Sequence, residues 1–203
     1  MPMTLFFAPT SPFVRKVRVC AAELGLADAI ELADCAPNRL KPDAELAAAN
    51  PLAQAPTLVL ESGQALYGSA VIALYLDELS GGRLVPAQGP ERWTALVRQS
   101  LADTITESGQ LLRYETSVRP EAARWPEWAA SLEQKILAGA DAVEAMAEAM
   151  GETVDLGAIS LACALAYLDF RAPQIDWRAG RPAAAAWFER FAARPSMTGT
   201  GPQ

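Results

Sequence analysis

The first part of the chain alternates between short apolar runs and helical spacing. Thr4 to Phe7 is a run of strand-forming residues that leads into a proline-containing loop. Apolar residues then recur at three-to-four spacing from Phe13 to Leu24, which predicts a helix. Ser11 is expected to cap this helix, Pro12 suits its first position, and Gly25 is expected to end it.

The same alternation continues after this helix. Residues 30–32 predict a second strand, and residues 41–50 predict a short alanine-rich helix. Residues 57–60 and 65–67 flank a glycine-containing turn at a spacing that predicts a β-hairpin. Ser69 is expected to cap the last helix of this part. The predicted order of elements is therefore βαβα followed by ββα.

The segment between residues 80 and 90 holds three glycines and two prolines, the strongest interior change of composition in the chain. Because domain boundaries fall in such segments, we predict a first domain over residues 1–80, a linker over residues 81–89 and a second domain over residues 90–203.

The second domain shows periodic apolar positions without strand alternation. Residues 90–114 and 125–150 predict two long antiparallel helices. Asp155 is expected to cap a helix that is apolar around nearly its whole circumference, which belongs at the centre of the domain. Residues 182–194 predict a last amphipathic helix, and the tail beyond Pro195 is expected to be loose.

Composition narrows the possible partners. The chain has 203 residues, of which 51% are hydrophobic, and a formal net charge of −7. With no long Lys/Arg block, neither nucleic acid nor an anionic membrane is expected as a partner. The sequence shows neither a secretory signal pattern nor about 18 unbroken apolar residues, so we expect a cytosolic protein that does not span a membrane.

The titratable residues exclude several kinds of catalysis. The chain contains no histidine, which excludes Ser-His-Asp and Cys-His catalysis, and we expect no metal. Its three cysteines lack metal-ligand or C-x-x-C spacing and are expected to be reduced thiols. Cys20 and Cys163 are expected in the core, and Cys35 lacks an evident activator.

Ser11 lies where the first helix begins, at the positive end of the helix dipole, where an anion is favoured. The cationic residues Arg15, Lys16 and Arg18 follow it and strengthen the case for an anion. The alternative is that Ser11 only caps the helix and the cations are solvated.

Four segments resemble the glutathione transferase family, and they occur in the family's order. Residues 11–18 (SPFVRKVR) are similar to its active-site loop and first helix, and residues 50–58 (NPLAQAPTL) to its N-P-x-x-x-x-P-x-L segment. Residues 69–76 (SAVIALYL) resemble its S-x-A-I-x-x-Y-L helix, and residues 159–171 (ISLACALAYLDFR) its central C-terminal helix. The resemblance implies a thioredoxin-like α/β domain followed by an all-helical domain.

The resemblance also implies how glutathione binds. Ser11 would donate its hydroxyl to the sulfur of glutathione, with Thr10 as the alternative donor. Pro56 would be cis, so that the main chain of Ala55 pairs with the cysteinyl part of glutathione. Ser69 would hold the γ-glutamyl carboxylate.

Gln54 would offer an amide to glutathione, whereas Gly68 departs from the family, which usually has an acidic residue or Gln there. The implied activity is transfer of glutathione to a small apolar electrophile, a reaction typical of detoxification. Gly68 favours the alternative, a ligand- or protein-binding module without catalysis.

The resemblance further implies a homodimer and an electrophile site between the two domains. Phe13 of the first helix and residues of the first long helix are candidates for that site: Trp93, Thr104, Gln110, Arg113 and Tyr114. These residues are equally compatible with packing or dimer contacts.

Overall fold

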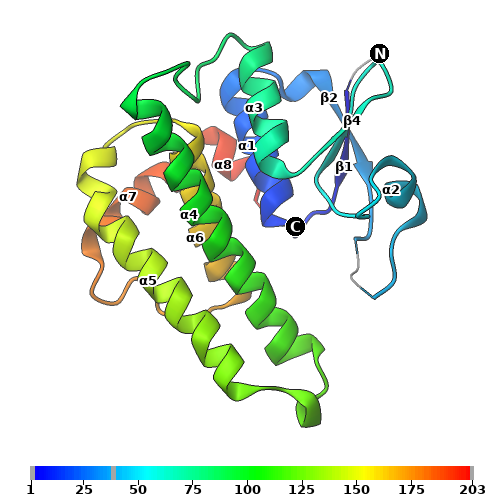
Figure 1. Cartoon of the computed structure of the whole chain (residues 1–203). Coiled ribbons are helices and arrows are strands. Elements are labelled where there is room, and N and C mark those ends of the chain that lie inside the picture. Colours follow the sequence, from blue (N-terminus) through cyan, green and yellow to red (C-terminus); the bar gives the residue numbers. More distant parts are fainter. Residues whose placement is uncertain (1–2, 38–39, 202–203) are drawn as a thin grey trace. The chain divides into compact units, whose positions relative to one another are not determined.

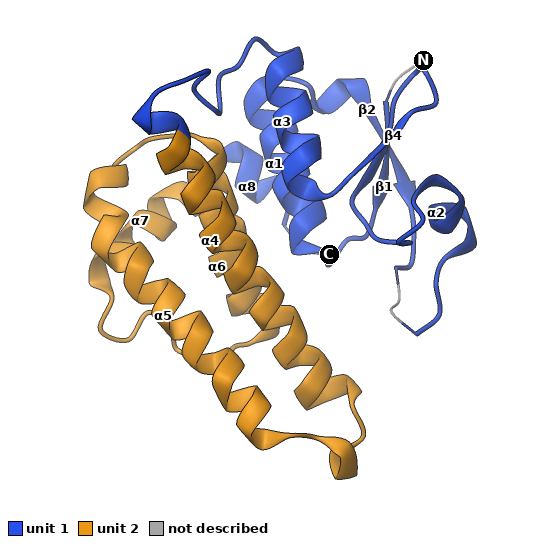
Figure 2. Ribbon diagram, viewed as in Figure 1, with its two compact units in different colours: residues 1–92, 195–203 blue, residues 93–194 orange. Residues whose placement is uncertain are grey.

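The computed structural model describes residues 3–37 and 40–201, and it divides into two compact units (Figure 2). The first unit comprises residues 1–92 together with residues 195–203, and the second comprises residues 93–194. The first unit is thioredoxin-like and the second is helical, as the sequence predicts.

The first unit is built on a four-stranded sheet with the order β2-β1-β3-β4 (Figure 1). The strands are β1 (Met3–Phe7), β2 (Ile30–Asp34), β3 (Thr57–Val59) and β4 (Ala65–Tyr67). β1 pairs with β2 in parallel and with β3 antiparallel, and β3 pairs with β4 antiparallel. The helical elements of this unit are α1 (Pro12–Leu24), a 3-10 turn (Ala27–Ala29), α2 (Ala44–Ala49) and α3 (Ser69–Leu79).

Both ends of α1 form as its sequence predicts. Ser11 is the N-cap, and its Oγ accepts a hydrogen bond from the N–H of Val14 at 3.3 Å. Gly25 ends the helix with a left-handed φ of 73°, a conformation that glycine adopts without steric cost. The helix buries one apolar face, which includes Val17 and Cys20.

Two expected helix starts are wrong by a few residues. α2 begins at Ala44 rather than Lys41, because the Asp43 carboxylate accepts the N–H of Leu46 and fixes the start there. α3 begins at Ser69 itself, so Ser69 does not cap it; the N-cap is Gly68, with φ 86° and no side chain to accept a hydrogen bond.

The helical unit holds the two long helices and the buried helix that the sequence predicts. They are α4 (Pro90–Arg113), which starts in the first unit, α5 (Pro126–Met150) and α6 (Leu156–Arg171). A π-helix (Tyr114–Val118) and a 3-10 turn (Glu121–Ala123) join α4 to α5, and α7 (Pro182–Ala192) follows α6. α4 and α6 pack closely at Gly157, where an added Cβ would lie 2.5 Å from the Cβ of Arg98.

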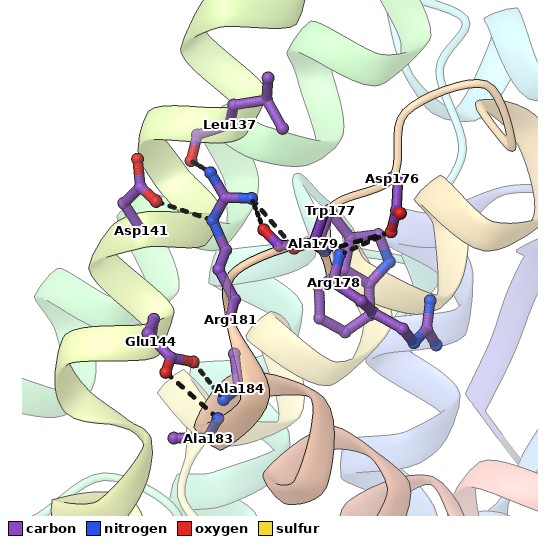
Figure 3. Close-up of polar contacts among 10 residues, drawn as sticks. All are labelled: Leu137, Asp141, Glu144, Asp176, Trp177, Arg178, Ala179, Arg181, Ala183 and Ala184. Carbon is purple, nitrogen blue, oxygen red and sulfur yellow. Dashed lines mark hydrogen bonds and ion pairs between the residues drawn. The ribbon is translucent and has the colours of Figure 1, made fainter.

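α7 is held against α5 by polar contacts (Figure 3). The guanidinium of Arg181 donates to the Asp141 carboxylate at 2.7 Å and to the main-chain carbonyl of Leu137 at 3.4 Å. The Glu144 carboxylate of α5 accepts the N–H groups of Ala183 and Ala184 at 3.2 and 2.7 Å. A side chain from another helix thus caps α7.

The tail after Pro195 is not loose, which corrects the sequence expectation. It forms α8 (Pro195–Thr198) and packs on α1 within the first unit. Arg15 of α1 donates to the carbonyl of Met197 at 3.1 Å, and Ser196 donates to the Glu23 carboxylate at 2.5 Å. Met197 is buried, so the tail completes the first unit's core.

Candidate functional site

Strand register brings three loops of the first unit to one end of the sheet. Phe6 of β1 lies opposite Thr57 of β3, and Thr57 lies opposite Tyr67 of β4. The loop after β1, the loop before β3 and the turn after β4 therefore leave the sheet at the same end. These loops carry the glutathione-site residues that the sequence predicts: Thr10, Ser11, Gln54, Ala55, Pro56, Gly68 and Ser69.

Ser11 lies at the N-terminus of α1, where its hydroxyl accepts one hydrogen bond. Its N–H closes a turn by donating to the carbonyl of Ala8 at 3.0 Å, and its Oγ accepts the N–H of Val14. A hydroxyl that accepts one hydrogen bond keeps its own O–H for a second partner. Thr10, inside the turn, is exposed.

The loop before β3 is organised by Asn50, a residue to which sequence reasoning assigned no role. Asn50 is buried; its amide nitrogen donates to the carbonyl of Gln54 and to the hydroxyl of Thr57, each at 3.0 Å. Its amide oxygen accepts the N–H of Leu52 at 2.9 Å. The Asn-Pro sequence was the available signal, since asparagine before proline favours such a turn.

This network presents the main chain of Ala55 for recognition. The peptide bond between Ala55 and Pro56 is cis, as the resemblance implies. Within residues 3–37 and 40–201, the N–H and C=O of Ala55 have no hydrogen-bond partner. The neighbouring side chain of Gln54 is exposed. A donor, an acceptor and a side-chain amide thus lie together in this loop.

The start of α3 has unused hydrogen-bond donors. Ser69 is 7% exposed, yet its hydroxyl has no hydrogen-bond partner in the described part of the chain. The N–H groups of the first turn likewise find no side-chain acceptor there, because the N-cap is Gly68. Such a helix terminus favours a carboxylate.

The cations after Ser11 make other contacts. Arg15 donates to Met197 in α8. Lys16 is buried, with Nζ 5.6 Å from the centre of the Phe13 ring. Arg18 stacks on Phe7, 4.9 Å from the ring centre. Arg15 and Arg18 are thus engaged with Met197 and Phe7, and the hydrogen bond from Val14 to Ser11 defines the start of α1.

The candidates for the electrophile site belong to both units. Phe13 lies in the first turn of α1 and is half-buried. On α4, Thr104 is exposed and its hydroxyl donates to the carbonyl of Ser100 at 3.1 Å. Arg113 is the last residue of α4 and Tyr114 is the first of the π-helix. Their contact with an electrophile stays a prediction.

Tyr167 is a polar residue in the helical unit that sequence reasoning passed over. It is 7% exposed and lies on α6, with its ring against Gly109 of α4. Burial raises the pKa of Tyr167, and the positive charges of Arg113 and Arg171 partly oppose this effect. A tyrosine in an otherwise apolar helix was the available signal.

The cysteines are free thiols, as expected. Cys20 and Cys163 are buried. Burial, with smaller contributions from Asp43 and Asp34, raises the pKa of Cys35 to about 11, so this thiol is protonated at neutral pH. In the described ranges, no three Cys, Asp or Glu side chains gather as a metal would need. No helix described here is long and apolar enough to cross a membrane.

Comparisons with known proteins match both units. The model of the glutathione S-transferase N-terminal domain matches residues 10–79, and that of the glutathione S-transferase C-terminal domain matches residues 126–190. The GST-like protein YibF of Escherichia coli K12 is 30% identical to this chain over 204 residues, which is 98% of each chain.

Solved structures agree with these matches. A glutathione transferase family member from Pseudomonas fluorescens Pf-5, with bound glutathione, is 40% identical, covers 99% of each chain and has a TM-score of 0.96. A second structure of a glutathione transferase family member from Pseudomonas fluorescens Pf-5 carries S-(propanoic acid)-glutathione, with 38% identity, 99% and 100% coverage and a TM-score of 0.92. A glutathione S-transferase from Methylobacterium radiotolerans, in complex with glutathione sulfonate, is 30% identical, with 100% and 95% coverage and a TM-score of 0.87.

Proposed function

This chain belongs to the glutathione S-transferase family, and from that premise we propose that it transfers the thiolate of glutathione to a small apolar electrophile. The observation that carries the proposal is the Ser11 hydroxyl, which caps α1 and whose O–H donates to no partner within residues 3–37 and 40–201. In the reaction this O–H donates a hydrogen bond to the sulfur of glutathione, which attacks the electrophilic carbon.

A hydrogen bond from Ser11 matters because a free thiol is a poor nucleophile at neutral pH. Its pKa is about 8.5, so only a few per cent is ionised at pH 7. A charge-assisted hydrogen bond contributes about 1.5–3 kcal/mol, which lowers the pKa by about one to two units. At pH 7 the thiolate share of the bound thiol then rises from a few per cent to between about a quarter and three quarters.

The rest of glutathione is a peptide with a carboxylate at its γ-glutamyl end. The unpaired N–H and C=O of Ala55 suit an antiparallel pairing with its cysteinyl part, and the exposed Gln54 amide adds a hydrogen bond. The hydroxyl of Ser69 and the first amides of α3 suit the carboxylate. Gly68 contributes main chain only.

Related structures support this assignment of the ligand. The two structures from Pseudomonas fluorescens contain glutathione and S-(propanoic acid)-glutathione, and that from Methylobacterium radiotolerans contains glutathione sulfonate.

The test replaces Ser11 by alanine and Thr10 by valine in separate variants. We expect Ser11→Ala to lower kcat/KM with an aryl halide by about 10- to 100-fold, the kinetic equivalent of one charge-assisted hydrogen bond. The pKa of bound glutathione, followed by thiolate absorbance, rises in the same variant. Thr10→Val, the matched control, changes neither quantity.

Three results separate the competing hypotheses. Reversed effects in the two variants assign the thiolate to Thr10. A wild-type protein that binds glutathione without ionising it, and turns over no electrophile, supports the non-catalytic binding module that Gly68 favours. A wild-type protein that folds but does not bind glutathione contradicts the transferase proposal and leaves the ligand- or protein-binding module.

We also propose that the protein is a homodimer. Val71 and Leu79 on α3 are 51% and 53% exposed, and Trp93 and Val97, one turn apart on α4, are 65% and 67% exposed. Large apolar side chains that share the exposed face of one helix favour burial against a partner. Sedimentation is expected to give twice the 21.6 kDa mass of one chain, and a mass of one chain contradicts the proposal.

A further inference from the structure

A hollow lies in the first unit, lined by residues other than those assigned to glutathione. This groove has a volume of about 220 Å³ and is formed by α1, the face of β1 and β2, and α8. Its apolar walls include Leu5, Ile30, Leu32 and Ala21, and α8 and its extension close one side with Pro195 and Thr200. We call it the tail groove.

The tail groove has fixed walls. Arg15 and Glu23, on two different turns of α1, hold α8 through Met197 and Ser196. Thr200, at the groove, donates to the carbonyl of Ser196 at 2.7 Å. A pocket whose walls are positioned before a ligand arrives loses little entropy on binding.

One charged residue lines the tail groove, and it is Arg18. Its guanidinium stacks on Phe7, and in the described part of the chain no carboxylate forms an ion pair with it. Burial and the positive charge of Arg15 lower the pKa of Arg18, so its surroundings disfavour its charge. By contrast, Arg98, Arg119, Arg178 and Arg181 of the helical unit all pair with carboxylates.

We propose that the tail groove binds a small apolar monocarboxylate, with the carboxylate on Arg18 and the apolar body against Leu5, Ile30 and Leu32. An anion there supplies the missing partner of a half-buried guanidinium. The groove is smaller than the about 300–1,000 Å³ of sites for drug-sized ligands, so the occupant is the size of an aromatic or short-chain acid. The inference does not depend on the transferase reaction.

The probe is 4-(trifluoromethyl)benzoate, compared with its uncharged amide of the same shape, in ¹⁹F NMR titrations at saturating glutathione. We expect the benzoate to bind and the amide to bind at least tenfold more weakly. Arg18→Gln is expected to weaken the benzoate at least tenfold and leave the amide unchanged. The matched control is Arg190→Gln, which alters an exposed arginine of α7.

A second variant keeps the test decisive if Arg18→Gln perturbs folding. Ala22 lines the groove, and Ala22→Leu fills it without changing a charge, so both probes are expected to lose binding. The proposal is overturned if the benzoate and the amide bind alike, if neither binds at millimolar concentration, or if Ala22→Leu leaves benzoate binding unchanged. Benzoate binding that is seen without glutathione and lost at saturating glutathione also overturns it, because the probe then occupies the glutathione site.

Discussion

The helices α3 and α7 both begin without a capping side chain of their own, and they differ in the partners of their first amides. At α7 the N-cap is Arg181, and Glu144 of α5 accepts two of the first amides. At α3 the N-cap is Gly68, and within the described chain no side chain accepts from the first turn. The fold therefore satisfies one helix terminus from within and leaves the other open.

The difference separates a structural role from a binding role. Unpaired amides at a helix terminus attract a negative group, and a carboxylate from the same fold removes that attraction. The open terminus of α3 lies at the end of the sheet where the Ser11 turn and the Ala55 loop also emerge. An external carboxylate is therefore the partner expected for α3.

The largest effect is expected when the N-terminus of α3 receives a carboxylate of its own. We expect Ser69→Asp to weaken glutathione binding about 100-fold, because two carboxylates then compete for the same amides. The same variant gains about 0.5 kcal/mol of unfolding free energy from the helix dipole. Calorimetry with glutathione and urea denaturation measure the two effects.

The control for this variant is Ser69→Ala. It removes the hydroxyl alone, so we expect about tenfold weaker binding and no gain of stability. If Ser69→Asp binds glutathione as the wild type does, the carboxylate of the ligand is not held at α3.

The reverse change removes the carboxylate that caps α7. Glu144→Ala leaves the amides of Ala183 and Ala184 without their acceptor, and we expect it to lower the free energy of unfolding by about 2 kcal/mol. Urea denaturation tests this, with Glu148→Ala on the same helix as the control, expected within about 0.5 kcal/mol. Equal stability of the two variants contradicts the capping role of Glu144.

A smaller effect is expected where the helix supplies its own cap. The Asp155 carboxylate accepts the N–H of Ala158 at 2.7 Å, so Asp155→Ala is expected to cost about 1 kcal/mol of unfolding free energy. Asp155→Asn retains an accepting oxygen and is expected to cost less than half as much. If Asp155→Asn costs as much as Asp155→Ala, the ion pair of Asp155 with Arg98 at 3.5 Å outweighs the cap, because both variants remove that charge and only the alanine variant removes the cap.

The smallest effect on stability is expected from the charge of Asp43. Asp43 caps α2, and hydrogen bonds from Leu46 and Ala36 lower the pKa of its carboxyl. A lowered pKa stabilises the fold above the unfolded value of about 3.9, and the gain is lost as pH falls through the folded pKa. We expect wild type to exceed Asp43→Asn in stability at pH 6 to 7, and the difference to decrease as the pH falls below the unfolded value of about 3.9 and through the folded pKa. A difference that is constant with pH contradicts this assignment.

The sequence predicts those features that depend on neighbouring residues. The cap of α1 by Ser11 and its end at Gly25 follow from side chains within one turn of each terminus. The cap of α7 lies 39 residues from the amide it serves, so no local pattern reveals it. The sequence predicts Ser69 as the cap of α3. This prediction is wrong, because the positive φ of Gly68 is a property of the folded turn.

The candidate site shows the same difference between features that neighbouring residues determine and features that the fold determines. Its residues are predicted from the resemblance, which names Ser11, Ala55 and Ser69. The grouping of their loops at one end of the sheet depends on strand register, which composition does not give. The buried network of Asn50 was hidden for the same reason, since its partners are defined only once the loop is closed.

The return of α8 to the first unit also has a consequence for synthesis. The first 92 residues leave the ribosome early, whereas their partner segment, which begins at Pro195, emerges only after the whole helical unit. During translation, α1 therefore lacks its hydrogen bonds to Met197 and Ser196. The first unit of the nascent protein therefore becomes complete only after the helical unit has been synthesised, although most of it is encoded first.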